Sequence, residues 1–284
     1  MLAPSPFSHA FVRVSRTGRS ILSFLRLQDV SVEFPIYQPS SRSLKKLLLA
    51  SSTRGNLGRD AKDRINVRAL SRVSFEVAEG DRFALIGLNG AGKTTLLKVL
   101  AGIYEPTSGR FTSSGRVSSL LDMNLGFNFD ATGRENIILR GMYMGIHPRE
   151  MRERAAEAAE FTELGDYLDM PVRTYSAGMI IRLAFAAATC TLPDVLIMDE
   201  WLTVGDAQFL EKAQRRVESF VRTSSILVLA SHSLELVQQW CNRGILLHQG
   251  RAVMIGPVEE VIAAYRRLVE FGVPPGFSLE PSDG

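Results

Sequence analysis

Residues 87–95 read GLNGAGKTT, and this short segment constrains the fold more than any other part of the chain. It matches every fixed position of the phosphate-binding pattern G-x-x-x-x-G-K-[ST]. The apolar run RFALI precedes it, and TTLLKVLAGI follows it with leucine and valine at helical spacing. We therefore expect a strand, a tight glycine loop and a helix in that order, which is a unit of a sheet with crossover helices.

The residues of this loop predict that it binds the phosphates of a nucleotide. Glycines let the backbone curl so that successive N–H groups point at phosphate oxygens, and the start of the following helix adds its positive end. Lys93 should reach the terminal phosphates, and the hydroxyl of Thr94 should ligate Mg²⁺. We expect ATP and Mg²⁺ as cofactors, with nucleotide contacts from Gly87, Leu88, Asn89, Gly90, Ala91, Gly92, Lys93, Thr94 and Thr95.

Polar side chains at two further strand ends fit the same site. Residues 194–200 read DVLIMDE, and two carboxylates at the end of a buried strand need a cationic partner. Beside a phosphate loop, Asp199 fits the Mg²⁺ site through water, and Glu200 fits a general base for the attacking water. His232 follows the next apolar strand and would sense the γ-phosphate. Taken alone, a DE pair is often a solvated strand end, and a lone histidine is more often structural.

The rest of the chain alternates between strand and helix patterns. LRLQDVSVEF (25–34) alternates apolar and polar residues like a half-buried strand, and we expect residues 35–66 to be an inserted loop with a short amphipathic helix. The run from RENIILRG to ELGDYL is helical with a break near Pro148, and AQFLEKAQRRVESFVRT is helical too. GILLHQGRAVMIG reads as a hairpin and VEEVIAAYRRLVE as a last helix. This order predicts an α/β fold with a mostly parallel sheet.

Residues 175–179 read YSAGM, and here the sequence resembles the ATPase subunits of ABC transporters, whose signature is LSGGQ. The resemblance covers residues 25–265 and implies an ABC-type P-loop NTPase core, with an antiparallel β subdomain and an α-helical subdomain at 123–185. It also implies that Ser176 and Gly178 contact ATP held by a second subunit, as a serine at a helix start can bind an anion. By the same resemblance Asp206, in WLTVGDAQF, is the aspartate that follows the carboxylates, and His232 is the switch histidine.

Two positions depart from the family pattern. Where the family has a glutamine before the helical region, this chain reads SSLLDMNLGF, so Asp122 or Asn124 is the candidate for the contact to Mg²⁺ or water. The aromatic residue that stacks on adenine is Phe34 or Tyr37, and Phe34 fits better by its place after VSVE. A core role for Phe34 is an equal alternative.

Within this family, YSAGM with IRLAFA, TGRENI (132–137) and DEWLTVGD resemble the branch that exports O-antigen, capsule or teichoic-acid chains. That branch implies a homodimer of ATPase subunits with separate membrane permease subunits, at the cytoplasmic face of the bacterial inner membrane. The permease should dock on the surface around residues 123–150. Many members carry a C-terminal β-sandwich that binds the glycan, and we expect none after residue 265, where we place a tail (266–284).

Composition limits the remaining classes. The chain has 33 Lys+Arg against 30 Asp+Glu, so its net charge of +3 gives no reason to expect a nucleic-acid partner. It has no run of about 18 apolar residues, so we expect no membrane span. Residues 1–24 make a poor secretory signal, and we expect them to be disordered. Cys190 and Cys241 lack metal-ligand spacing and should be small buried thiols in a reducing cytoplasm.

Three alternatives to polysaccharide export stay open. A soluble ABC-type ATPase that acts on ribosomes or DNA usually has tandem cassettes or a coiled-coil insertion, and the sequence shows neither. A regulator that binds ATP without hydrolysing it is disfavoured by intact Lys93, Asp199, Glu200 and His232. A drug or lipid exporter with the same ATPase chemistry is the serious alternative within transporters.

Overall fold

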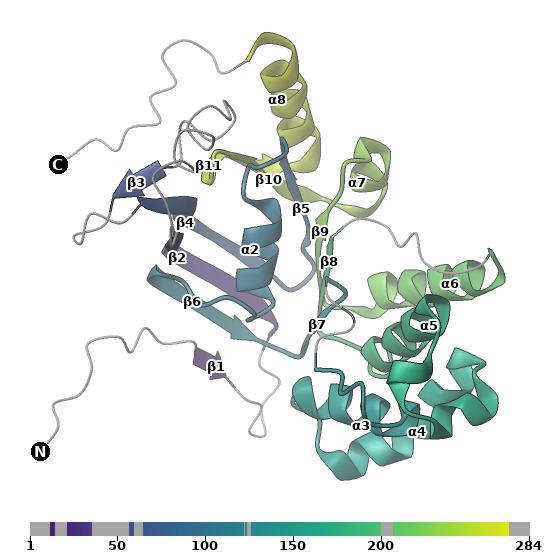
Figure 1. Ribbon diagram of the computed structural model, residues 1–284. Coiled ribbons are helices and arrows are strands. Elements are labelled where there is room, and N and C mark those ends of the chain that lie inside the picture. Colours follow the sequence, from purple (N-terminus) through teal and green to yellow (C-terminus); the bar gives the residue numbers. More distant parts are fainter. Residues whose placement is uncertain are drawn as a thin grey trace, which may run out of the picture. The chain divides into compact units, whose positions relative to one another are not determined.

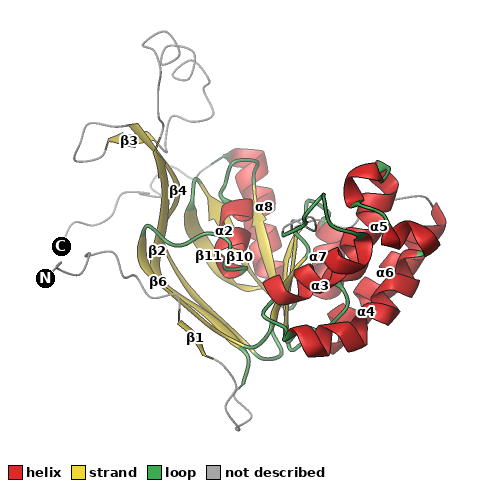
Figure 2. Ribbon diagram, turned by 60° about the horizontal axis from the view of Figure 1, so that its bottom comes forward, coloured by secondary structure: helices red, strands yellow, loops and turns green. Residues whose placement is uncertain are grey.

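The computed structural model describes residues 12–14, 22–35, 57–59, 65–121, 123, 126–199 and 207–272. The chain divides into two compact units, Met1–Ser114 with Val228–Gly284 and Gly115–Leu227. Figure 1 labels the elements along the chain, and Figure 2 separates helices from strands.

The first unit contains a mostly antiparallel sheet with the strand order β1-β6-β2-β4-β3. Its central strand β2 (Phe24–Pro35) pairs antiparallel with β4 (Ile65–Ala78) and β6 (Ser108–Ser114). Leu25 and Leu27 of β2 are buried and Arg26 between them is exposed, which is the predicted alternation of a half-buried strand. The short strand β3 (Leu57–Arg59) pairs with β4, and β1 (Val12–Val14) pairs parallel with β6. Three residues of the extension that we expected to be disordered therefore form a strand.

A second sheet has the strand order β11-β10-β5-β9-β8-β7. Its strands are β5 (Arg82–Gly87), β7 (Val117–Ser119), β8 (Val195–Asp199), β9 (Ile226–Ala230), β10 (Arg243–His248) and β11 (Arg251–Pro257). The pairs β10–β5 and β7–β8 are parallel. The edge pair β10–β11 is antiparallel, which confirms the predicted hairpin. Strand β9 is buried along its whole length, as expected of a strand covered on both faces.

In the described part of the first unit, the helices are α2 (Lys93–Leu100), α7 (Leu234–Trp240) and α8 (Val258–Phe271). Helix α2 packs on β4 and β5 through Leu96, Leu97, Val99 and Leu100, which are buried. Helix α8 packs on β10, β11 and β5 (Figure 1). It continues to Phe271, past the position at which we expected the tail to begin.

The second unit contains α3 (Gly133–Tyr143), α4 (Pro148–Thr162), α5 (Ala177–Ala188) and α6 (Ala207–Thr223), gathered together in Figure 2. Two 3-10 turns, η1 (Gly165–Asp169) and η2 (Val172–Thr174), precede α5. His147 caps α4 in front of Pro148, so the predicted break is confirmed. The helix ends earlier than the sequence pattern suggested, because Glu163 adopts a left-handed conformation with φ 57°.

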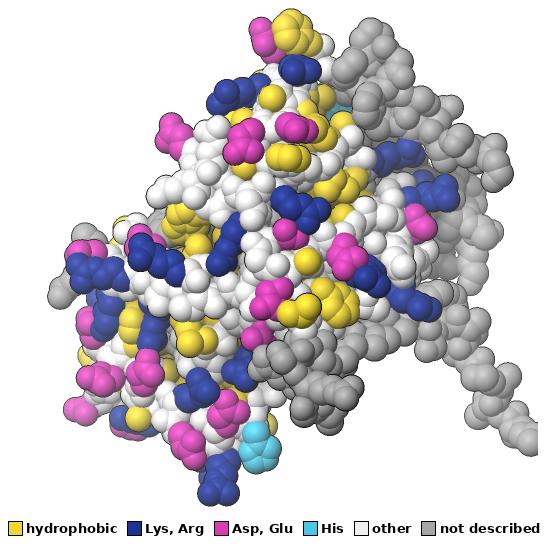
Figure 3. All heavy atoms as spheres, turned by 180° about the vertical axis from the view of Figure 1, so that it is seen from behind, with side chains coloured by type: hydrophobic (Ala, Val, Ile, Leu, Met, Phe, Trp, Pro, Cys, Tyr) yellow, Lys and Arg dark blue, Asp and Glu magenta, His cyan; other side chains and the backbone are white. Residues whose placement is uncertain are grey.

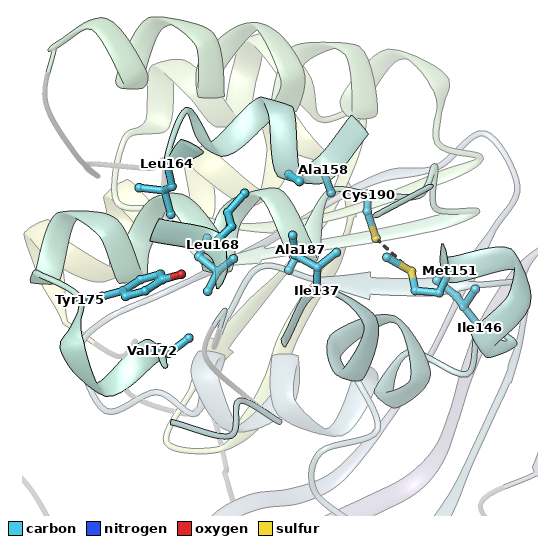
Figure 4. Packing of buried hydrophobic residues seen from close by; sticks show 12 residues of the cluster. Ile137, Ile146, Met151, Ala158, Leu164, Leu168, Val172, Tyr175, Ala187 and Cys190 are labelled. Atoms are coloured by element: carbon cyan, nitrogen blue, oxygen red, sulfur yellow. Dashed lines mark hydrogen bonds between the residues drawn. The ribbon is translucent and has the colours of Figure 1, made fainter. Parts of the chain in front are cut away.

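Helices α3, α4 and α5 share one apolar core, shown in Figure 4. Its members include Ile137 of α3, Met151 of α4, Ala187 of α5, and Leu168 and Tyr175 from the segment between α4 and α5. Residues of α3, α4, α5 and the segment between α4 and α5 therefore contribute to a single cluster.

Both cysteines are buried free thiols, as the sequence predicted. Burial raises the pKa of Cys190 to about 11 and that of Cys241 to about 12, so neither forms a reactive thiolate near neutral pH. The thiol of Cys190 lies 3.8 Å from the sulfur of Met151 (Figure 4).

Among the residues that the structure describes, no helix combines the length and the hydropathy that a membrane crossing requires. On the face drawn in Figure 3, side chains of both charge signs are interspersed, and neither sign forms a continuous patch.

Candidate nucleotide site

The phosphate loop lies between β5 and α2, and its backbone needs glycine at specific positions. Gly90 and Gly92 have φ angles of 76° and 102°, a region that side chains with a Cβ rarely adopt. A Cβ on Gly92 would lie 2.7 Å from the carbonyl oxygen of Ala69, and one on Gly87 would lie 2.4 Å from that of Leu247. Local geometry and close packing therefore both fix this loop.

Lys93 begins α2, and its ammonium group turns back over the loop. Its Nζ donates to the carbonyl oxygens of Gly87 at 2.7 Å and of Leu88 at 3.2 Å. Helix α2 has no acidic residue in its first turn, and its N-cap Gly92 makes no side-chain capping bond. The positive end of the helix and the ammonium group thus coincide at the loop, an arrangement that suits an anion. Asn89, Gly90 and Thr94 are exposed there.

Phe34, the candidate adenine-stacking residue, lies near the end of β2 and is 38 % exposed. Its ring meets the ring of Tyr104 edge to face, with 5.5 Å between the centroids. Lys98 of α2 lies over the other aromatic ring of this pair, 5.1 Å from the centroid of Tyr104. Phe34 is therefore a partly exposed aromatic residue at the surface and not a core residue.

His232 follows β9, the strand next to β5 in the sheet order. It is exposed, between buried Ser231 and the N-cap residue Ser233 of α7. The hydroxyl of Ser231 accepts a hydrogen bond from the backbone N–H of Ser233 at 3.1 Å, which fixes the turn that carries the histidine.

Asp199 ends β8, whose other four residues are buried. It is partly exposed, so the last residue of an otherwise apolar strand is a carboxylate that reaches the surface. The candidates Asp122, Glu200 and Asp206 lie outside the described residues, as do the alternatives Tyr37 and Asn124. Of the described candidates, the loop residues, Phe34 and His232 belong to the first unit, and Asp199, Ser176 and Gly178 belong to the second.

The signature segment YSAGM forms the start of α5, at the surface of the second unit. Ser176 is the N-cap, and its hydroxyl accepts from the backbone N–H of Met179 at 3.3 Å. Ser176 and Gly178 are exposed, and a Cβ on Gly178 would meet no atom within 4 Å. The first turn of α5 has no acidic residue. This helix start is open and positive, as a site for an anion requires.

Tyr175, the first residue of the signature segment, is buried and fixed by a hydrogen bond. It is 8 % exposed, and its hydroxyl donates to the carbonyl oxygen of Tyr167 at 2.5 Å. Burial raises the pKa of Tyr175, against a smaller opposing effect of a hydrogen bond from the backbone of Gly133, so the hydroxyl stays protonated and donates. We did not predict this support, although TGRENI, which contains Gly133, was notable in the sequence.

Comparison with known proteins places the chain in a family. A family model described as ABC transporter matches residues 70–203. An O-antigen export system ATP-binding protein of Yersinia enterocolitica is 40 % identical over 229 residues, which cover 81 % of this chain and 96 % of that protein. The chain belongs to the ABC transporter family. The predicted family is thus confirmed, and this ABC ATPase is an ATP hydrolase that serves transport.

Other relatives match different shares of their own length. An O-antigen export system ATP-binding protein of Myxococcus xanthus is 43 % identical over 74 % of this chain, and the chain spans about half of it (48 %). A teichoic acids export ATP-binding protein of Lactococcus lactis is 36 % identical over 80 % of this chain and 49 % of its own length.

Solved structures show the fold. The dimeric post-hydrolysis structure of the ATP-binding cassette MJ0796 has a TM-score of 0.57 at 18 % identity and covers 82 % of this chain and 98 % of its own. An ATP-binding subunit of an ABC transporter has a TM-score of 0.58 at 22 % identity, covering 86 % and 93 %. The predicted ABC-type P-loop fold is therefore confirmed.

Proposed function

We propose that this ABC ATPase powers the export of a lipid-linked polysaccharide, of the O-antigen, capsule or teichoic-acid type, across a bacterial cytoplasmic membrane. The similarity to O-antigen export ATP-binding proteins carries the proposal, since those of Yersinia enterocolitica and Klebsiella pneumoniae are matched over 96 % and 97 % of their length. Relatives named for teichoic acids export support the same class of cargo. They favour polysaccharide export over a drug or lipid exporter.

The phosphate loop is the part of the chain that would hold ATP. Its backbone, the start of α2 and the Lys93 ammonium present positive charge with no acidic side chain in the first turn of α2, which fits a polyphosphate. Phe34 would stack on the adenine. The hydroxyl of Thr94 and the carboxylate of Asp199 are oxygen ligands of the kind that Mg²⁺ prefers, with Asp122 as a further candidate. When bound, Mg²⁺ would neutralise charge on the phosphates.

Hydrolysis needs residues that act on water. We propose Glu200 as the base or the orienting group for the attacking water, and His232 as the residue that senses the γ-phosphate. The exposed position of His232 after β9 supports this role, because its side chain is accessible to a ligand.

Two copies of the chain would sandwich two ATP molecules. The open start of α5, with Ser176 and Gly178 exposed, would cover the γ-phosphate of the nucleotide held by the other copy's phosphate loop. Asp206 would lie at the same interface. ATP binding would close the dimer and hydrolysis would open it, and permease subunits docked around residues 123–150 would follow this cycle. The chain would thus be peripheral, at the cytoplasmic face of the membrane.

A strain that depends on this chain for surface polysaccharide tests the proposal. Replacing Lys93 with alanine removes the ammonium from the phosphate loop, so we expect ATP turnover and surface polysaccharide to be lost, with lipid-linked chains accumulating inside the cell. Arg215→Ala is the matched control, because Arg215 lies at the surface in an ion pair with Glu211, with side chains 76 % and 66 % exposed. Normal surface polysaccharide in the Lys93→Ala strain, with loss of drug or lipid efflux instead, would overturn the proposal.

A further inference from the structure

Asn136 is a fully buried polar residue at the start of α3, 0 % exposed. Its Oδ1 accepts from the backbone N–H of Asn128 at 2.7 Å. Its Nδ2 donates to the carbonyl oxygens of Asn128 at 2.8 Å and Thr132 at 2.9 Å, with a longer contact to Ala131 at 3.3 Å. A single side-chain amide therefore satisfies several backbone groups of the loop 128–132. Only a side chain with both a donor and an acceptor can make this pattern.

The loop 128–132 in turn holds the segment that leads into the signature. The backbone N–H of Val172 donates to Ala131 at 3.0 Å, and that of Arg173 donates to Phe129 at 2.9 Å. An antiparallel bridge joins Thr132 to Pro171. We refer to residues 128–132 and 171–173 together as the brace. Because its two halves are joined by backbone bonds, a shift of one half displaces the other.

The brace continues directly into the start of α5, where the anion site is proposed. The backbone N–H of Tyr175 donates to Val172 at 3.0 Å, and its ring and hydroxyl are buried against α3 and η1. A Cβ on Gly133 would lie 2.5 Å from the Tyr175 hydroxyl, so the start of α3 packs directly against Tyr175 with no room for a side chain. Ser176 is the next residue along the chain. A continuous series of contacts thus runs from Asn136 to the N-cap of α5.

We propose that Asn136 is a positioning residue for the nucleotide site that the second copy completes. It touches no nucleotide itself, and it fixes where the start of α5 presents Ser176 and Gly178. The inference rests on the proposed homodimer. A buried amide that only stabilised the unit would change its melting temperature, whereas a positioning residue also changes how well one copy covers the ATP of the other.

The variant Asn136→Asp is the sharpest test, because the shape is kept while both donors are lost and a carboxylate faces three carbonyl oxygens. In a Glu200→Gln background, which traps ATP under the proposed mechanism, we expect ATP-driven dimerisation to weaken at least about tenfold. Binding of a fluorescent ATP analogue to the monomer should stay within about twofold, because the phosphate loop is untouched. Analytical ultracentrifugation and fluorescence titration measure the two quantities.

Thr162→Val is the matched control. Thr162 is also 0 % exposed in the second unit, and its hydroxyl donates to Ala159 and accepts from Leu164. The control should lower the melting temperature and leave ATP-driven dimerisation unchanged. Equal losses of dimerisation in the two variants, at equal losses of melting temperature, would overturn the positioning role.

Tyr175→Phe keeps the test decisive if Asn136→Asp does not fold. It removes only the hydroxyl, with its bond to Tyr167, and should weaken dimerisation about threefold in the same direction. Unchanged dimerisation in Asn136→Asp, or in Tyr175→Phe where Asn136→Asp does not fold, beside a Glu200→Gln chain that dimerises with ATP, would overturn the inference and leave the proposed function standing. A Glu200→Gln chain that does not dimerise with ATP would overturn the proposed homodimer, and the inference with it.

Discussion

The start of α2 and the start of α5 both lack acidic side chains in their first turn, yet they are held in place by different means. The start of α2 is fixed locally, by glycines with positive φ and by Lys93, six residues after Gly87. The start of α5 is fixed from a distance, by a serine cap and by a brace that depends on Asn136, forty residues earlier. The phosphate loop depends on few residues outside it, Ala69 and Leu247 among them, whereas the start of α5 depends on the packing of a whole unit.

The largest effect is expected from a substitution that distorts the phosphate loop. Gly92→Ala forces a Cβ into a backbone with φ 102°, 2.7 Å from the carbonyl oxygen of Ala69. We expect nucleotide affinity to fall at least about 100-fold and the free energy of unfolding to fall by about 3 kcal/mol, since strained conformations and backbone clashes add. Titration with a fluorescent ATP analogue and chemical denaturation measure these quantities.

Gly178→Ala is the control for that prediction at the other helix start. Its Cβ would have no atom within 4 Å, so the fold should be as stable as the parent or more stable. Nucleotide binding by the monomer should not change. If Gly92→Ala binds nucleotide as the parent does, the loop does not hold the phosphates.

The next largest effect separates two roles of Ser176, which are the capping of α5 and the proposed contact with ATP. Aspartate and asparagine cap a helix as well as serine does, so Ser176→Asp and Ser176→Asn should each keep the free energy of unfolding within about 0.5 kcal/mol. Only the aspartate adds a negative charge where the proposed γ-phosphate approaches, and we expect ATP turnover to fall at least about tenfold more than in the asparagine variant. Equal turnover in the two variants would mean that no phosphate approaches this helix start. Steady-state ATPase assays at several protein concentrations measure the difference.

A smaller effect is expected where the brace meets the signature. Gly133→Ala places a Cβ 2.5 Å from the Tyr175 hydroxyl and 2.9 Å from Cδ2 of Leu168. We expect the free energy of unfolding to fall by about 2 kcal/mol and turnover to fall about threefold, because the clash displaces Tyr175 and hence the N-cap. Gly256→Ala is the control, since its nearest atoms lie at 3.8 Å and 4.0 Å. Undiminished turnover in Gly133→Ala would show that the signature does not depend on α3.

The parts of the molecule that the sequence predicted well are those fixed by neighbouring residues. Helix α6 spans Ala207–Thr223, the same residues as the helical run in the sequence, and the glycine loop follows β5 as expected. Strand β8 lies within the apolar run DVLIMDE, and β9 is the apolar strand expected before His232. In each case composition and periodicity of a short segment suffice, because the element buries its own apolar residues.

The parts that the sequence did not predict depend on distant partners. Strands β6 and β7 come from the serine-rich run SGRFTSSGRVSS, which has little strand character, and they form because β2 and β8 pair with them. Asn136 was visible in TGRENI, but nothing local shows that its amide holds the loop 128–132. The phosphate loop was therefore predictable in detail, while the support of the signature needed the structure.

The smallest expected effect concerns the ion pair that joins the two halves of the brace. Asp130 forms an ion pair with Arg173 at 2.5 Å across the two halves, but their side chains are 79 % and 61 % exposed. Exposed pairs contribute little, so Asp130→Asn should lower the free energy of unfolding by less than about 0.5 kcal/mol and change turnover less than about twofold. Chemical denaturation at low and high salt measures this change in the free energy of unfolding. Screening at high salt should remove it. If Asp130→Asn instead weakened dimerisation as much as Asn136→Asp, surface charge rather than the buried amide would hold the brace, and the start of α5 would depend on ionic strength.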